Sequence, residues 1–109
     1  MVSVKKADSI FEERLAELTA EFYRSLPVRL REIATVTADA ESGAVSAMEE
    51  LRLTLHRLAG SAATFGLPKL SSSARSVEEC IDRDLARLPP ALSDESRAGL
   101  AALASVALE

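Results

Sequence analysis

The spacing of the apolar residues restricts this chain to helical folds. Over most of the 109 residues they recur at every third or fourth position, which gathers them on one side of an α-helix. A sheet protein would need strict alternation and more β-branched and aromatic residues, whereas aromatic residues make up only 4% of this chain. We therefore expect an all-α protein.

The first helix is predicted to follow a flexible arm of residues 1–7. Asp8 or Ser9 is suited to cap it, and the helix is expected to kink near Pro27 or to divide into two collinear helices at Ser25. Its apolar stripe consists of Phe11, Leu15, Leu18, Phe22 and Leu26, and it continues through Leu30, Ile33 and Val36. We expect the phenylalanines of this stripe, and Phe65 further along, to lie in the core.

Three further helices are predicted at about residues 44–65, at about residues 68–88 and from Ser93 onward. The first of these helices is expected to have the core stripe Leu51, Leu55, Leu58, Ala62 and Phe65, and the second the buried face Leu70, Ala74, Val77, Ile81, Leu85 and Leu88. The apolar residues of the last helix are Leu100, Leu103, Ala104 and Ala107. Short connections between amphipathic helices favour an antiparallel up-and-down four-helix bundle that forms one domain over residues 1–109. We expect a monomer, because no apolar stripe is left over once the bundle is packed.

Charge and composition exclude several classes of function. The net charge of −4 and the pI near 5.1 argue against nucleic acid as a partner. No apolar run approaches the ~20 residues of a membrane span, and the N-terminus lacks a secretory signal. The single cysteine favours a cytoplasmic protein, and one histidine with one cysteine is too few for a zinc site, so no metal is expected.

The single histidine, His56, is predicted to face outward. At 100° per residue it lies about 140° from the centre of the apolar stripe of residues 51–65. Gly60 is one turn further along the same face, where glycine costs ~1 kcal/mol relative to alanine. An accessible imidazole beside a patch without side chains, flanked by Leu53 and Ala63, suits the docking of a second protein.

The run from His56 to Gly66 reads His-Arg-Leu-Ala-Gly-Ser-Ala-Ala-Thr-Phe-Gly. It resembles the signature of histidine-containing phosphotransfer domains of bacterial phosphorelays, which is His-x-Leu-Lys-Gly-Ser/Ala-x-x-x-hydrophobic-Gly. The resemblance covers most of the chain and continues through Leu70, Ala74, Val77 and Glu78. It implies a four-helix bundle. The sequence contains no Gly-rich phosphate loop and no kinase signature, so we expect a phosphocarrier without kinase activity of its own.

The resemblance also implies a role for several residues. His56 would accept a phosphoryl group on Nε2 from the aspartyl phosphate of a receiver domain and pass it to another receiver, and the partner receiver would supply the divalent metal. Glu78 occupies the position whose side chain accepts a hydrogen bond from the imidazole Nδ1–H, which leaves Nε2 free to attack. The expected docking surface consists of Leu53, Arg57, Ala59, Gly60 and Ala63.

One position departs from the family pattern. The family usually has lysine three residues after the histidine, where this chain has Ala59. Arg57, Lys69 and Arg75 are candidates to supply the missing positive charge, and Arg75 is the first choice. The departure keeps open an alternative function, in which a non-phosphorylated interaction module binds or sequesters a response regulator.

Overall fold

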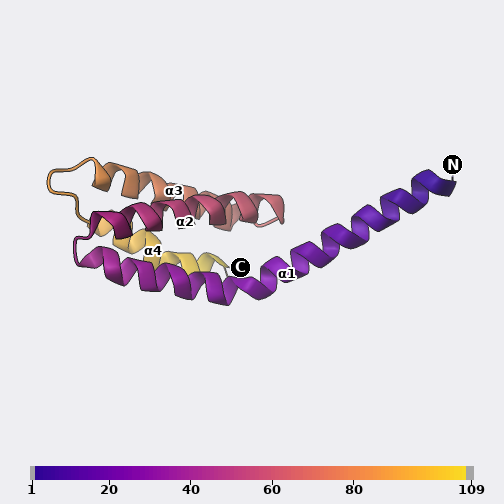
Figure 1. The fold of residues 1–109 in the computed structure, drawn as a ribbon, viewed down its shortest axis with the longest axis horizontal. Coiled ribbons are helices and arrows are strands. Elements are labelled where there is room, and N and C mark those ends of the chain that lie inside the picture. The colour runs from indigo at the N-terminus through magenta and orange to yellow at the C-terminus, as the bar shows by residue number, and fades with distance from the viewer. Residues whose placement is uncertain (1, 108–109) are drawn as a thin grey trace.

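Residues 2–107 form four α-helices and no strand in the computed structural model, which describes this part of the backbone and the side chains of residues 8–107 (Figure 1). The helices are α1 (Val2–Glu41), α2 (Val45–Thr64), α3 (Pro68–Leu85) and α4 (Asp94–Ala107). Successive helices run in opposite directions and pack against each other, and α4 returns to α1. The predicted all-α, up-and-down bundle is confirmed.

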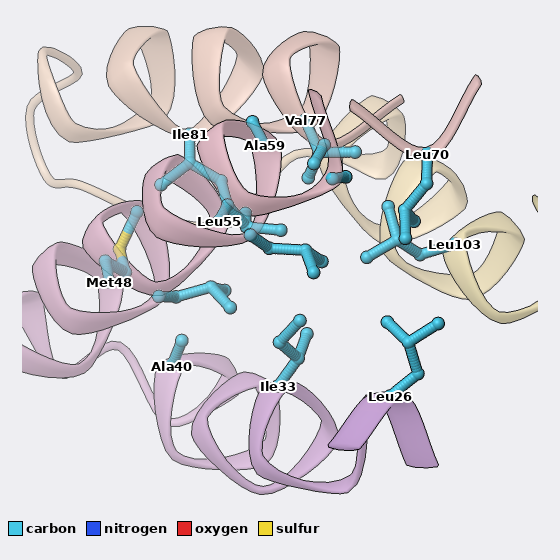
Figure 2. Close-up of a cluster of buried hydrophobic side chains, with 14 of the residues drawn as sticks. Leu26, Ile33, Ala40, Met48, Leu55, Ala59, Leu70, Val77, Ile81 and Leu103 are labelled. Atoms are coloured by element: carbon cyan, nitrogen blue, oxygen red, sulfur yellow. The ribbon is translucent and has the colours of Figure 1, made fainter. Parts of the chain in front are cut away.

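The predicted stripe of α2 forms the centre of the core. Leu51, Leu55, Leu58 and Ala62 are almost completely buried, and Phe65 packs against Phe22 with ring centroids 5.1 Å apart. Figure 2 shows Leu55 of α2 among core side chains of the other three helices, which include Ile33 of α1, Val77 of α3 and Leu103 of α4. Burying each leucine contributes on the order of 2 kcal/mol, so this contiguous cluster holds the bundle together.

Helix α1 differs from its prediction in where it begins. It is helical from Val2, so the predicted cap at Asp8 or Ser9 is wrong and residues expected to form an arm belong to the helix. It also continues through Pro27, and Figure 1 shows its N-terminal half leaving the bundle at an angle to its C-terminal half. Proline accounts for such a bend, because it has no N–H to donate and its ring crowds the carbonyl of Tyr23.

The N-terminal half of α1 extends past the rest of the bundle and stretches the molecule to 62 × 22 × 20 Å. Phe11 is therefore 68% exposed, so its prediction as a core residue is wrong, and Leu15 of the same stripe is also exposed. Periodicity places both on one face but does not say how far the neighbouring helices reach. A monomer was expected because packing of the bundle would leave no apolar stripe exposed. This apolar face is left uncovered, so that expectation loses its basis.

The connections follow the predicted turn residues. Gly43 and Gly66 have positive φ angles of 88° and 80°, a conformation that favours glycine, and Pro68 begins α3. Helix α3 ends at Leu85, three residues earlier than expected, so Leu88 is 96% exposed and its prediction as a core residue is wrong. Among the apolar residues of α4, Leu103 is buried and Ala104 is exposed.

Asp84, a buried carboxylate near the end of α3, fixes the start of α4. Its Oδ2 accepts hydrogen bonds from Ser93 N (3.0 Å), Ser93 Oγ (3.1 Å) and Ser96 Oγ (2.5 Å). Ser93 in turn caps α4, since its Oγ accepts a hydrogen bond from Ser96 N at 3.1 Å. Burial alone raises the pKa of the Asp84 carboxyl, but the hydrogen bonds from Ser96 and Ser93 outweigh this and hold the pKa below its ordinary value.

Removal of the Asp84 carboxylate is expected to destabilise the bundle. Asp84→Ala leaves the buried Ser96 hydroxyl and the Ser93 amide without their acceptor, and we expect a loss of about 2–4 kcal/mol in urea unfolding at neutral pH. Asp39→Ala, which removes an exposed carboxylate from α1, is the control and should change stability by less than about 0.5 kcal/mol.

The same variant predicts a pH dependence. A depressed carboxyl pKa contributes stability above the unfolded-state pKa, and this contribution is lost as the pH falls through the folded-state value. The difference in the free energy of unfolding between wild type and Asp84→Ala should therefore be constant above about pH 5. It should shrink as the pH falls below 3.8, the ordinary pKa of an aspartate. A difference that stays constant down to pH 2 would contradict the assignment.

Candidate functional site

His56 lies on the outer face of α2, near the middle of the helix. Its neighbours Leu55 and Leu58 point into the core, and 68% of the His56 side chain is exposed. The outward orientation predicted from the helical phase is therefore present. A rigid helix holds the imidazole at the surface, where another protein can reach it.

Glu78 of α3 holds the imidazole from one side. Its Oε2 and Oε1 lie 3.0 and 3.3 Å from His56 Nδ1, and only 15% of the Glu78 side chain is exposed. A carboxylate accepts hydrogen bonds, so this contact favours the tautomer with the proton on Nδ1. In the neutral imidazole the lone pair is then on Nε2, the nitrogen that Glu78 does not contact.

Two further contacts fix α2 against α3 on either side of this pair. Arg52, one turn before His56, lies with its Nε 3.3 Å from Oδ1 of Asp82, one turn after Glu78. On the other side, the buried Ser71 hydroxyl donates a hydrogen bond of 2.8 Å to the carbonyl oxygen of Ala59. Neither contact was predicted from the sequence. The Arg52–Asp82 pair does follow once His56 is placed opposite Glu78, because the helices are antiparallel and the residue four positions before His56 then faces the residue four positions after Glu78.

A shallow surface hollow adjoins the imidazole, between α2 and α3. The residues that line it are His56, Ala59, Gly60, Arg75, Glu78, Glu79 and Asp82. Of the three cationic candidates, the structure therefore brings Arg75 to the histidine. Lys69, at the start of α3, and Arg57, on the outer surface of α2, are not among the residues that line the hollow.

Four of the five residues expected on the docking surface are exposed around His56: Leu53, Arg57, Gly60 and Ala63. Ala59 is the exception, because it is only 2% exposed and joins the core side chains between α2 and α3 (Figure 2). Its placement on the docking surface is wrong. Position 59 is four residues after Leu55 and three before Ala62, both core residues, so the spacing already indicated burial.

Gly60 is not required by the packing of this chain. Apart from the adjoining residues and backbone of α2 itself, no heavy atom lies within 4 Å of the position that a Cβ would occupy there. At Gly99 of α4, by contrast, a Cβ would lie 2.7 Å from Cγ2 of Val77, so close packing of α3 against α4 does require a glycine. The open space above Gly60 therefore belongs to the surface around His56.

A comparison with protein-family models matches residues 10–106 to the Hpt domain. The chain belongs to the Hpt domain family. Hpt domains are phosphocarriers of two-component systems and interact with receiver domains, so this Hpt domain has a function related to phosphotransfer. Searches of curated proteins and of solved structures gave no match.

Two kinds of feature are absent from the described part of this Hpt domain, a membrane-spanning helix and a cluster of metal-binding side chains. Within the described residues, no helix is long and apolar enough to cross a membrane. Nor do the described side chains include a group of three or more histidine, cysteine, aspartate or glutamate residues placed to hold a metal ion.

Proposed function

We propose that His56 Nε2 accepts a phosphoryl group from the aspartyl phosphate of a receiver domain and passes it to the aspartate of another receiver. The observation that carries this proposal is the contact between His56 Nδ1 and Glu78, which leaves the other ring nitrogen of this mostly exposed side chain without a contact to Glu78. The match to the Hpt domain supports the partner class.

In the transfer step, the Nε2 lone pair attacks phosphorus. A bond from Nε2 to phosphorus forms, the bond from phosphorus to the aspartyl oxygen breaks, and its electron pair stays on the receiver carboxylate. The imidazole keeps its Nδ1 proton and becomes positively charged, and the Glu78 carboxylate beside it stabilises that charge. Such a step depends mainly on positioning and charge stabilisation.

The direct test is label transfer. Receiver domains from the same organism, labelled with phosphate on their aspartate, are mixed with the purified domain, and label on this chain is followed over time. We expect acid-labile, base-stable label that peptide mapping assigns to His56. Absence of label from every receiver, despite measurable binding to one of them, would reject the phosphocarrier function.

That negative result would favour the alternative, an interaction module that binds or sequesters a response regulator without carrying phosphate. The observation that favours it is the charge of the hollow beside His56. Glu78, Glu79 and Asp82 place three carboxylates there, and residue 59 is an alanine. Binding without transfer, unaffected by loss of the imidazole, is the result that this alternative predicts.

Glu78 is proposed to position the imidazole, and its removal should slow transfer. Loss of a hydrogen bond to a charged group corresponds to about a tenfold change or more, so we expect Glu78→Ala to lower the transfer rate by about tenfold. Glu78→Gln should lower the transfer rate by a smaller factor, since the amide oxygen still accepts a hydrogen bond from Nδ1.

The adjacent residue provides a matched control for Glu78. Glu79 is exposed and lines the same hollow but makes no contact with the imidazole among the described side chains. Glu79→Ala should therefore show no loss of transfer rate. Equal losses in Glu78→Ala and Glu79→Ala would mean that surface charge, rather than the contact with Nδ1, sets the rate.

A further inference from the structure

The hollow beside His56 carries an unfavourable charge for the group that it would receive. Three of its lining side chains are the carboxylates of Glu78, Glu79 and Asp82. A phosphoryl group brings a charge of about −1.5 to −2, and neighbouring carboxylates repel it. A cation at this position would offset that repulsion.

Arg75 is the one permanently charged cation among the described residues that line the hollow. The other cation nearby, Arg52, lies with its Nε 3.3 Å from Oδ1 of Asp82. Arg75 is exposed, and it makes no hydrogen bond or ion pair with any of the described side chains. Its guanidinium is therefore available to a ligand.

The register of α2 against α3 places Arg75 and the imidazole on the same hollow. His56 faces Glu78, and the helices are antiparallel, so residues that follow His56 in α2 face residues that precede Glu78 in α3. Gly60 and Arg75 lie in these directions, and both line the hollow. Because Gly60 has no side chain, the arginine side chain can extend over the backbone of α2 towards Nε2.

We propose that Arg75 binds the phosphoryl oxygens during transfer to and from His56 and is a catalytic residue of this domain. This inference rests on the proposed function. A guanidinium donates paired hydrogen bonds to phosphate oxygens and keeps its charge at all relevant pH values, so it can offset the carboxylates without exchanging a proton. The bonds made and broken are those of the transfer step described above.

The test compares Arg75→Gln with wild type in two transfer reactions. The first donor is a labelled receiver domain, and the second is phosphoramidate, a small donor that phosphorylates histidine and releases ammonia without a docking partner. We expect Arg75→Gln to be slower with both donors by about tenfold to a hundredfold. Arg75→Lys, which keeps the charge but not the paired donors, should lose less of the rate than Arg75→Gln, and the receiver affinity of each variant should stay within about threefold of wild type.

Arg87→Gln is the matched control. It removes the same charge from an exposed arginine that follows the end of α3 and does not line the hollow. We expect it to transfer at the wild-type rate. Phosphorus NMR of the phosphorylated domain gives a second readout, since the phosphohistidine signal should shift in Arg75→Gln and not in Arg87→Gln.

Each of the other results has a distinct meaning. Wild-type rates in Arg75→Gln would overturn the role of Arg75 while leaving His56 as the acceptor. Equal slowing in Arg75→Gln and Arg87→Gln would overturn it as well, because net charge would then be responsible. A wild-type domain that takes no phosphoryl group from any donor would instead overturn the proposed function on which the role of Arg75 depends.

Discussion

His56→Gln should take no phosphoryl group from any donor, while it folds and binds a receiver as wild type does. The imidazole is the nucleophile in the proposed step, and a carboxamide nitrogen has no lone pair available for attack on phosphorus. The side chain is mostly exposed, so its replacement leaves no cavity, and we expect stability to change by less than about 0.5 kcal/mol. Label transfer, urea unfolding and receiver titration measure the three quantities.

This variant separates the two candidate functions. If signalling in cells stops while receiver binding persists, the domain acts by carrying phosphate. If signalling continues with His56→Gln, the phosphocarrier function is wrong and the interaction module is favoured. Arg87→Gln, at an exposed position that does not line the hollow, is a control for surface changes that leave the nucleophile intact, and it should still accept label.

Gly60→Arg should weaken receiver binding by about tenfold to a hundredfold. The position is exposed and one turn from His56, so a long side chain fills the space that a docking partner would occupy above the helix backbone. Forcing extra atoms into a closely packed contact typically costs 1–3 kcal/mol, which corresponds to that range of affinity. Titration of a receiver domain into the variant measures the effect.

Two variants control for the effects of charge and of folding. Ala98→Arg adds the same side chain at an exposed position of α4, and it should leave receiver affinity unchanged. Gly60→Ala should raise stability by about 0.5–1 kcal/mol, because a Cβ meets no atom there and alanine favours the helix. Wild-type affinity in Gly60→Arg would place the docking surface elsewhere.

The helices were predictable because a helix that is buried on one side has apolar residues at every third or fourth position of its sequence. The stripes of α2 and α3 were correct except at their ends, where Phe65 is only partly buried and Leu88 lies beyond the helix. The error at Phe11 has a different origin. A stripe shows which face of a helix is apolar, but the length of the neighbouring helices decides whether that face is covered.

Features of the site that depend on α2 alone were predictable from the sequence, whereas contacts between α2 and α3 were less so. The outward orientation of His56 and the exposure of Gly60 follow from the phase of α2 alone. The contact with Glu78 needed the resemblance to a family, and the Arg52–Asp82 pair needed the register of α2 against α3. The buried Asp84 was not predicted. Its position three residues after the buried Ile81 places it on the core face of α3, where a carboxylate needs hydrogen-bond donors such as Ser96.

The site has consequences for how a signal is stored. His56 and Glu78 are 22 residues apart and belong to a single helical hairpin, whose two helices continue without a break on both sides of the pair. Within the described residues the imidazole lies mid-helix, away from the loops that join the helices, so phosphorylation as proposed would act on a site that is helical on both sides. The domain would therefore hold information as a chemical bond rather than as a change of shape, and a partner would have to sense the phosphoryl group itself.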